Sequence, residues 1–161
     1  MTIESEERKG TTVRLFFPVA RGVAEEKKTQ AKDKGHRPIG KKTVLIVEND
    51  EAIRNMLVIV LNSIGLETHE AEDGLEALEA LGRISHIDLL FTDVVLSDGM
   101  SGTELAHEAR DRDRDIKVLL TSGYSEQALA QEGKLDEEFD LFPKPYSITE
   151  LVERLRTVLE G

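Results

Sequence analysis

The sequence predicts an α/β fold, specifically a flavodoxin-like (βα)5 three-layer sandwich built on a parallel five-stranded sheet. The first observation behind this prediction is that, from Thr43 onward, short β-rich segments alternate with segments of helical periodicity. This alternation is typical of a parallel sheet with helices on both faces. The second is that there are five such pairs, for which right-handed crossovers favour the strand order 2-1-3-4-5. The third is that polar side chains follow four of the strands.

Five segments are predicted to be strands because they are short, largely apolar and bounded by turn residues. They are residues 44–47, 66–71, 88–92, 116–120 and 139–142. The second segment is mostly polar, so we expect it at an edge of the sheet.

Helices are predicted to begin at residues 51, 74, 102, 125 and 148. Asp50 is a typical N-cap for the first of them. Ser101 and Ser147 are each followed three residues later by a glutamate, which is the capping-box pattern. The second helix carries three leucines that we expect to face the core: Leu75, Leu78 and Leu81.

The residues before Thr43 differ in composition from the rest of the chain. Residues 1–22 contain one strand-like segment, 11–18, which predicts an N-terminal hairpin or strand-like tail. Residues 23–42 are rich in Lys, Glu, Gln and Gly and are expected to form a flexible linker. We therefore predict a domain at 43–161, and we expect residues 1–42 to lie outside its core.

Charge and composition exclude several classes of function. Residues 1–42 carry 11 Lys and Arg against 6 Asp and Glu, whereas residues 43–161 carry 10 against 26. Such an acidic domain lacks the basic face that nucleic-acid binding requires. The chain has no cysteine, which excludes disulfides and thiolate metal sites. The lack of a long apolar segment or a secretory signal predicts a cytoplasmic protein that does not enter the membrane.

The rest of the domain is organised around an aspartate, Asp93, which directly follows the predicted buried strand Leu89-Leu90-Phe91-Thr92. Ligands of open α/β sheets bind beyond the carboxyl ends of the strands. In the order 2-1-3-4-5, Glu48 and Asn49 lie on one side of Asp93, and Thr121 and Lys144 lie on the other. The first group offers only oxygen ligands, which suit Mg2+. The second offers a cation and a hydroxyl donor for a phosphoryl group that Asp93 would accept.

Residues 43–161 resemble a response-regulator receiver domain of two-component signalling. The matching motifs are Val47-Glu48-Asn49-Asp50, Thr92-Asp93 with Gly102 after it, Thr121-Ser122-Gly123 and Lys144-Pro145-Tyr146. The resemblance implies that Asp93 is the phosphoacceptor, with Thr121 as the switch hydroxyl and Lys144 as the phosphate-binding lysine. It also implies a Mg2+ site formed by Glu48, Asn49, Asp93 and the carbonyl of Val95, and a cis peptide bond before Pro145.

The same resemblance implies partners rather than an independent catalytic activity. The phosphoryl donor would be a histidine kinase or a histidine phosphotransfer protein, and a receiver homodimer is a further implied interaction. Phosphoryl transfer and slow autodephosphorylation would be self-catalysed, so we do not expect an enzyme in the usual sense.

The sequence departs from the receiver pattern at three positions. Asn49 replaces the usual aspartate, Ser97 stands where a proline is common, and Leu141 replaces an aromatic residue that often reports phosphorylation. The last departure puts the usual threonine–aromatic switch in doubt, although Tyr146 or Phe142 would be near enough to contribute.

The segment 10–18, Gly-Thr-Thr-Val-Arg-Leu-Phe-Phe-Pro, resembles the last strand of a histidine-kinase ATPase domain. The chain is thus similar to the end of a hybrid histidine kinase. Because the nucleotide-binding motifs of such a domain are absent from these residues, we do not expect the chain to phosphorylate itself from ATP.

Two other functions fit parts of the pattern. A haloacid dehalogenase-like phosphatase also uses an aspartate at a strand end, but it needs a second carboxylate two residues later, where Val95 stands. A receiver-like module that binds partners without phosphorylation is compatible with Asn49 and Leu141. His107 is expected to face solvent on a helix rather than to act as a phosphohistidine. The other histidines, His36, His69 and His86, are scattered and are not expected to form a metal-ligand cluster.

Overall fold

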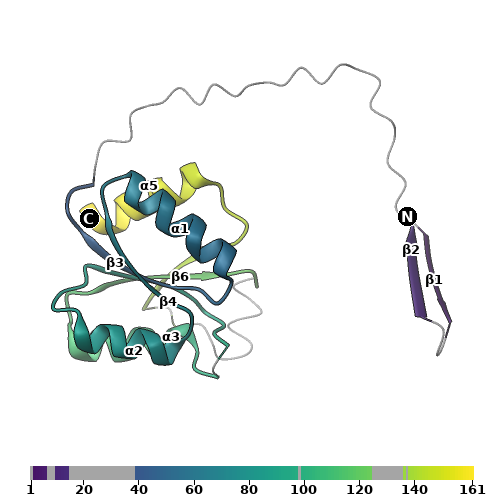
Figure 1. Ribbon diagram of the computed structural model, residues 1–161, viewed down its shortest axis with the longest axis horizontal. Coiled ribbons are helices and arrows are strands. Elements are labelled where there is room, and N and C mark those ends of the chain that lie inside the picture. The colour runs from purple at the N-terminus through teal and green to yellow at the C-terminus, as the bar shows by residue number, and fades with distance from the viewer. Residues whose placement is uncertain (1, 7–9, 15–38, 98, 125–135, 137) are drawn as a thin grey trace, which may run out of the picture. The chain divides into compact units, whose positions relative to one another are not determined.

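The computed structural model describes residues 2–6, 10–14, 39–97, 99–124, 136 and 138–161 (Figure 1). It divides into two compact units, Met1–Gly35 and His36–Gly161. Each unit is described below by itself.

The second unit is built on a five-stranded sheet. Its strands are β3 (Thr43–Val47), β4 (Glu67–Ala71), β5 (Leu89–Asp93), β6 (Lys117–Ser122) and β7 (Asp140–Pro143). All neighbouring strands are parallel, and their order is β4-β3-β5-β6-β7. Counted along the unit, this order is 2-1-3-4-5, which confirms the predicted flavodoxin-like topology.

Four helices are described in this unit: α1 (Glu51–Ser63), α2 (Gly74–Arg83), α3 (Gly102–Arg112) and α5 (Ile148–Glu160). Helices α1 and α5 lie on one face of the sheet, and α2 and α3 lie on the other (Figure 1). The helix predicted over residues 125–131 lies outside the described residues. Within the described part of the chain, no helix is long and apolar enough to cross a membrane.

The sheet separates two apolar cores because successive side chains of a strand point to opposite faces. On β5, Leu89 and Phe91 join the core beneath α1 and α5. Leu90, between them, joins the core beneath α2 and α3. Each of these three side chains is at most 1% exposed. A strand that is buried on both faces has no polar alternation, which explains the continuous apolar sequence that precedes Asp93.

The helix starts follow the local chemistry that the sequence predicts. The Asp50 carboxylate accepts hydrogen bonds from the amides of Ala52 and Ile53, at 2.9 and 3.1 Å. Ser101 and Ser147 form complete capping boxes with the glutamates three residues later. These bonds satisfy backbone amides that would otherwise lack an acceptor in the first helical turn.

The prediction that Leu75 of α2 faces the core is wrong, because this residue is 61% exposed. Leu78 and Leu81 pack against the core, but the fully buried positions of α2 are Gly74, Ala77 and Ala80. Small residues on this face let the helix lie close to the sheet, and they rotate the first leucine toward solvent.

The first unit contains an antiparallel hairpin, β1 (Thr2–Glu6) paired with β2 (Gly10–Arg14). An exposed ion pair joins Glu4 to Arg14 across it. The hairpin agrees with the strand-like tail expected for this end of the chain. Residues 15–18 of the predicted strand lie outside the described residues.

The segment just before β3 belongs to the second unit. The Ile39 amide donates to the carbonyl of Ile64 at 3.3 Å, and the Ile39 side chain packs against the α1–α5 core. Lys42 Nζ lies 2.7 Å from the Asp88 carboxylate, whose other oxygen accepts from the Thr43 amide at 2.8 Å. Most of the expected 23–42 linker lies outside the described residues, but Ile39 and Lys42 contact the folded domain.

These contacts predict different effects for two N-terminal deletions. Removing residues 1–35 should leave the thermal midpoint nearly unchanged. Removing residues 1–42 should lower it by about 5 °C or more, because it exposes the groove filled by Ile39 and leaves Asp88 without Lys42. Burial raises the pKa of Asp88, but hydrogen bonds from Lys42 and Thr43 outweigh this and lower it, so the ionised carboxylate stabilises the fold at neutral pH.

Thermal unfolding of the two deletions at pH 7 would check this prediction, with Lys42→Ala in the full chain as the control for the ion pair. Equal midpoints for the two deletions would show that residues 36–42 add nothing to the domain.

Candidate functional site

The site is formed where β3, β5 and β6 end. Asp93 is the last residue of β5, and Thr121 is its register partner on β6. Glu48 follows β3 directly and is only 3% exposed, although it carries a carboxylate. A buried carboxylate is costly unless it is paired, so Glu48 indicates a partner close by.

That partner is Lys144, which follows β7. Its Nζ lies 2.7 Å from Glu48 Oε2 and 2.8 Å from Asp93 Oδ2. The Lys144 side chain is 21% exposed, that of Asp93 15%, and that of Glu48 4%. One ammonium group therefore holds together two carboxylates that come from different strands.

The electrostatic effect is visible in the pKa of Lys144. Burial alone would lower the pKa, but the hydrogen bonds and charges of Asp93 and Glu48 raise it above the ordinary value. The lysine is thus a fixed positive charge at physiological pH. Its contribution to stability is complete at neutral pH and is lost only as the pH rises through the raised pKa.

The remaining oxygens of both carboxylates are held by backbone amides. The Val95 amide donates to Asp93 Oδ1 at 3.1 Å, and the Asp50 amide donates to Glu48 Oε1 at 3.2 Å. In addition, Arg54 Nη1 donates to the Glu48 carbonyl at 2.6 Å. The side chains of the site are therefore oriented before any ligand binds.

Gly102 allows the helix that follows Asp93 to approach it closely. A Cβ atom at this position would lie 2.1 Å from the Asp93 carbonyl oxygen and 3.1 Å from the Val94 Cα. The Gly102 amide donates to the Val94 carbonyl at 2.8 Å. Any larger residue would displace backbone at the end of β5, so the glycine of the motif has a steric cause.

The structure brings the other predicted site residues to the same edge of the sheet. Thr121 is 1% exposed, and its carbonyl accepts from the Val94 amide at 2.8 Å. Asn49 is exposed beside Glu48, and Val95 is 39% exposed. The Lys144–Pro145 peptide bond is cis.

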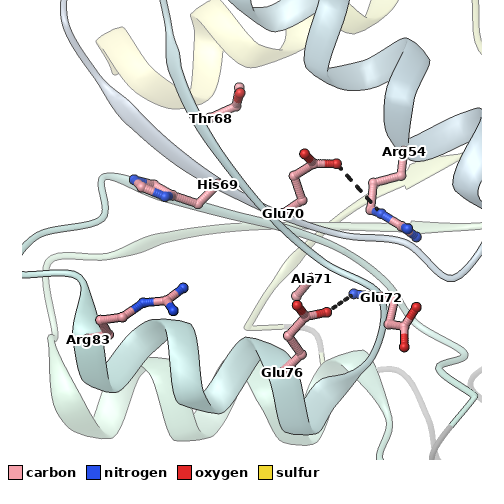
Figure 2. A pocket seen from close by; sticks show the side chains of 8 residues that line it. All are labelled: Arg54, Thr68, His69, Glu70, Ala71, Glu72, Glu76 and Arg83. Carbon is pink, nitrogen blue, oxygen red and sulfur yellow. Dashed lines mark hydrogen bonds and ion pairs between the residues drawn. The ribbon is translucent and has the colours of Figure 1, made fainter.

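A hollow lies along the edge strand β4 (Figure 2). It is lined by three glutamates and two arginines, with Thr68, His69 and Ala71. Arg54 crosses it toward Glu70, at 3.7 Å, and the Glu72 amide donates to the Glu76 carboxylate at 2.8 Å. The strand-end site, with its buried carboxylate and its paired lysine, remains the stronger candidate.

One side-chain cluster was not expected from the sequence. His107 Nε2 lies 3.0 Å from Asp136 Oδ2, and Arg110 Nη1 lies 2.7 Å from Glu138 Oε1. His107, Asp136 and Glu138 place their ligand atoms within 4.8 Å of one another. The His107 side chain is 48% exposed on α3, as expected, but its approach to residues 29 and 31 positions further along the chain depends on the fold and not on local sequence spacing. Arg110 already pairs with Glu138, which disfavours a cation there.

Comparison with known proteins gives the family. The response regulator receiver domain matches residues 44–156. The chain is similar to the sensor kinase CckA of Brucella abortus, with 36% identity over 164 residues, which cover 98% of this chain but only 17% of that kinase. The chain therefore spans a small part of that relative's length.

Similar solved structures support the same family. The receiver domain from the hybrid histidine kinase CckA has a TM-score of 0.60 and 31% identity, covering 73% of this chain and 98% of that one. The response regulator TrrA of Thermotoga maritima, solved in complex with Mg(2+)-BeF, has a TM-score of 0.61 and 30% identity, covering 73% and 99%. Together with the strand-end site, these matches show that the chain belongs to the response regulator receiver family and is a phosphoacceptor receiver of two-component signalling.

Proposed function

We propose that Asp93 accepts the phosphoryl group. The observation that carries this assignment is the bridge from Lys144 to both Asp93 and Glu48, which places a fixed cation against a partly exposed strand-end carboxylate. A carboxylate that was only structural would not need to remain open to solvent.

The proposed reaction forms a bond between a carboxylate oxygen of Asp93 and phosphorus. The bond from phosphorus to the donor's imidazole nitrogen breaks, and the imidazole keeps the electron pair. The product is an acyl phosphate. Lys144 and the Thr121 hydroxyl would interact with the non-bridging oxygens, which carry most of the negative charge.

Receiver domains as a class bind Mg2+, and the donor set of this chain fits that ion. Glu48, Asn49, Asp93 and the Val95 carbonyl provide only oxygen atoms, which Mg2+ prefers. Glu48 and Asp93 carry two negative charges and Lys144 carries one positive charge, so the site has a net negative charge that would attract a further cation. When bound, the ion would offset the charge of the incoming phosphoryl group.

Incubation of the chain with acetyl phosphate tests the proposal. We expect one phosphoryl group per chain by intact mass, its location on Asp93 by peptide mapping after borohydride reduction, and no reaction when Mg2+ is removed with EDTA. Modification at another carboxylate would show that the site is wrongly assigned.

Asn49 is expected to weaken Mg2+ binding without abolishing it. An amide oxygen can bind a hard cation, but it contributes a dipole in place of a full charge. Asp50 Oδ1 caps α1 by accepting from the amides of Ala52 and Ile53, which orients this carboxylate toward the helix. Replacing Asn49 with aspartate should therefore tighten Mg2+ binding about tenfold, or by about 1.4 kcal/mol.

Calorimetric titration with Mg2+ would measure this change. Asn62→Asp adds the same charge on the exposed end of α1 and serves as the control. Unchanged binding in Asn49→Asp would mean that residue 49 does not contact the ion.

Receiver domains interact with histidine kinases or phosphotransfer proteins, and we propose such a protein as the donor for this chain. We further propose that the chain acts in the cytoplasm, does not bind nucleic acid, and catalyses only its own phosphorylation and dephosphorylation. A receiver homodimer would be one way in which the phosphorylated form transmits its signal.

We also propose that residues 1–22 derive from the last strand of an ATPase domain and that residues 43–161 are the receiver. The alignment with CckA extends over 98% of the chain, and β2 covers residues 10–14 of the segment that resembles that strand.

A further inference from the structure

Two hydroxyl groups near the site are buried without a well-formed hydrogen bond. Among the described residues, the Thr121 Oγ1 and the Tyr146 hydroxyl are the only hydroxyl oxygens in this condition. A buried hydroxyl without a partner costs free energy, so such groups call for an explanation. Both lie at the pocket that holds Lys144.

Tyr146 is held in place by its ring. The ring stacks on Phe142, with centroids 4.7 Å apart and planes 21° apart. Both residues pack against the core beneath α1 and α5. Leu141, which stands at the position of the usual reporting aromatic, packs into the opposite core instead. The phenol of Tyr146 is thus a fixed aromatic group close to the site, supplied from a different position.

The surroundings of the phenol are those of the phosphorylation site. Burial raises the pKa of Tyr146, the charge of Lys144 and the Thr121 hydroxyl counteract this, and Glu48 and Asp93 add to it. Phe142, on which the Tyr146 ring stacks, is the register partner of Thr121, so the sheet places the phenol near the Thr121 hydroxyl, although neither hydroxyl has a well-formed hydrogen bond.

The hydrogen-bonding capacity of the two groups limits how they can pair. A threonine hydroxyl has one proton to donate and can accept from other groups. If Thr121 donated to Tyr146, it would have no proton for a phosphoryl oxygen. If Tyr146 donates to Thr121 Oγ1, the threonine proton is directed away from the phenol and toward the pocket. A chain of two such bonds is also mutually strengthening.

We propose that Tyr146 is a positioning residue for Thr121. When Asp93 is phosphorylated, the Tyr146 hydroxyl donates to Thr121 Oγ1 and Thr121 donates to a phosphoryl oxygen, which satisfies both orphaned hydroxyls at once. This inference rests on the proposed phosphorylation of Asp93. It assigns to Tyr146 a role that Leu141 cannot fill, because a leucine side chain has no donor.

The test compares Tyr146→Phe with Tyr124→Phe, which removes the hydroxyl of the exposed tyrosine on the β6 side of the site. Affinity for beryllofluoride in the presence of Mg2+ is measured in each variant, together with the lifetime of the phosphoryl group on Asp93. Losing one neutral hydrogen bond should weaken beryllofluoride binding about threefold to tenfold in Tyr146→Phe and not in Tyr124→Phe.

A double substitution tests whether the Tyr146 hydroxyl acts through Thr121. In a Thr121→Val background, which removes the hydroxyl and keeps the shape, Tyr146→Phe should have no further effect on beryllofluoride affinity. If the two substitutions instead act additively, the Tyr146 hydroxyl acts independently of Thr121, and the inference is overturned.

A spectroscopic measurement avoids changing Tyr146 at all. The chain has two tyrosines and no tryptophan, so in Tyr124→Phe the tyrosine absorption and fluorescence report Tyr146 alone. We expect both signals to change when beryllofluoride binds. Phosphorylation of Asp93 with an unchanged Tyr146 signal would overturn this inference alone, whereas failure to phosphorylate Asp93 would overturn the proposed function together with it.

Discussion

Replacing Lys144 with alanine is expected to destabilise the domain and shorten the lifetime of the phosphoryl group. Lys144 is the cation that pairs with the buried Glu48, at 2.7 Å. Removing one partner of a buried ion pair leaves an uncompensated charge, which we expect to lower the free energy of unfolding by about 3 kcal/mol. The lower end of the usual range applies because the pocket opens to water at Asp93.

Mg2+ should restore part of this stability, because a divalent ion can replace the ammonium between the two carboxylates. The thermal midpoint of Lys144→Ala should therefore rise more steeply with Mg2+ than that of the wild type. Differential scanning calorimetry over a Mg2+ series would measure this, with exposed Lys41→Ala as the control. Equal responses of the two variants would indicate that Lys144 does not compete with the ion.

The chemistry should be affected separately from the stability. At a temperature where Lys144→Ala remains folded, its phosphoryl group should be lost faster, because a charge-assisted contact worth about 1.5–3 kcal/mol is absent. An assay of partner binding by the phosphorylated variant should then show that the variant fails to switch. Binding equal to that of the phosphorylated wild type would contradict the role proposed for Lys144.

Replacing Asp93 with asparagine is expected to abolish phosphorylation entirely. The amide oxygen lacks the nucleophilic charge of the carboxylate, so no acyl phosphate can form. The fold should survive, since the amide oxygen can still accept from Val95 and Lys144 keeps its bond to Glu48. We expect the free energy of unfolding to change by less than about 1 kcal/mol.

Intact mass after incubation with acetyl phosphate and Mg2+ would check this, alongside a thermal melt. Asp111→Asn, at an exposed position on α3, makes the same chemical change away from the site. Phosphorylation of Asp93→Asn at the wild-type level would mean that another group is the acceptor.

Much of the fold was predictable because its signals are local. The part of a strand that is buried on both faces must be apolar, and residues 89–91 show this. Asp50, Ser101 and Ser147 bond to amides within three residues of themselves, so the sequence alone is enough to place those helix starts. Leu75 was assigned to the wrong face because the sequence shows the spacing of the leucines but not that alanines and a glycine form the contact surface of α2.

The site was predictable in outline and not in detail. Parallel strands of known order must bring their carboxyl ends together, which places Asp93 near Glu48 and Thr121. That Lys144 spans both carboxylates depends on the path of the chain after β7, which no local pattern encodes. Local sequence patterns also do not encode the surroundings of the buried Tyr146 hydroxyl or the contact of His107 with Asp136. Each depends on residues that lie far apart in the sequence.

The two edge strands of the sheet bear on how this protein behaves at high concentration. An open edge can recruit strands from other molecules and start fibrous aggregates. Along β4, Glu67 and Glu70 are exposed, so two copies meeting at this edge would repel each other. On the opposite edge, β7 ends in Pro143, which has no amide proton to offer a neighbour. We expect the concentrated protein to stay clear at neutral pH.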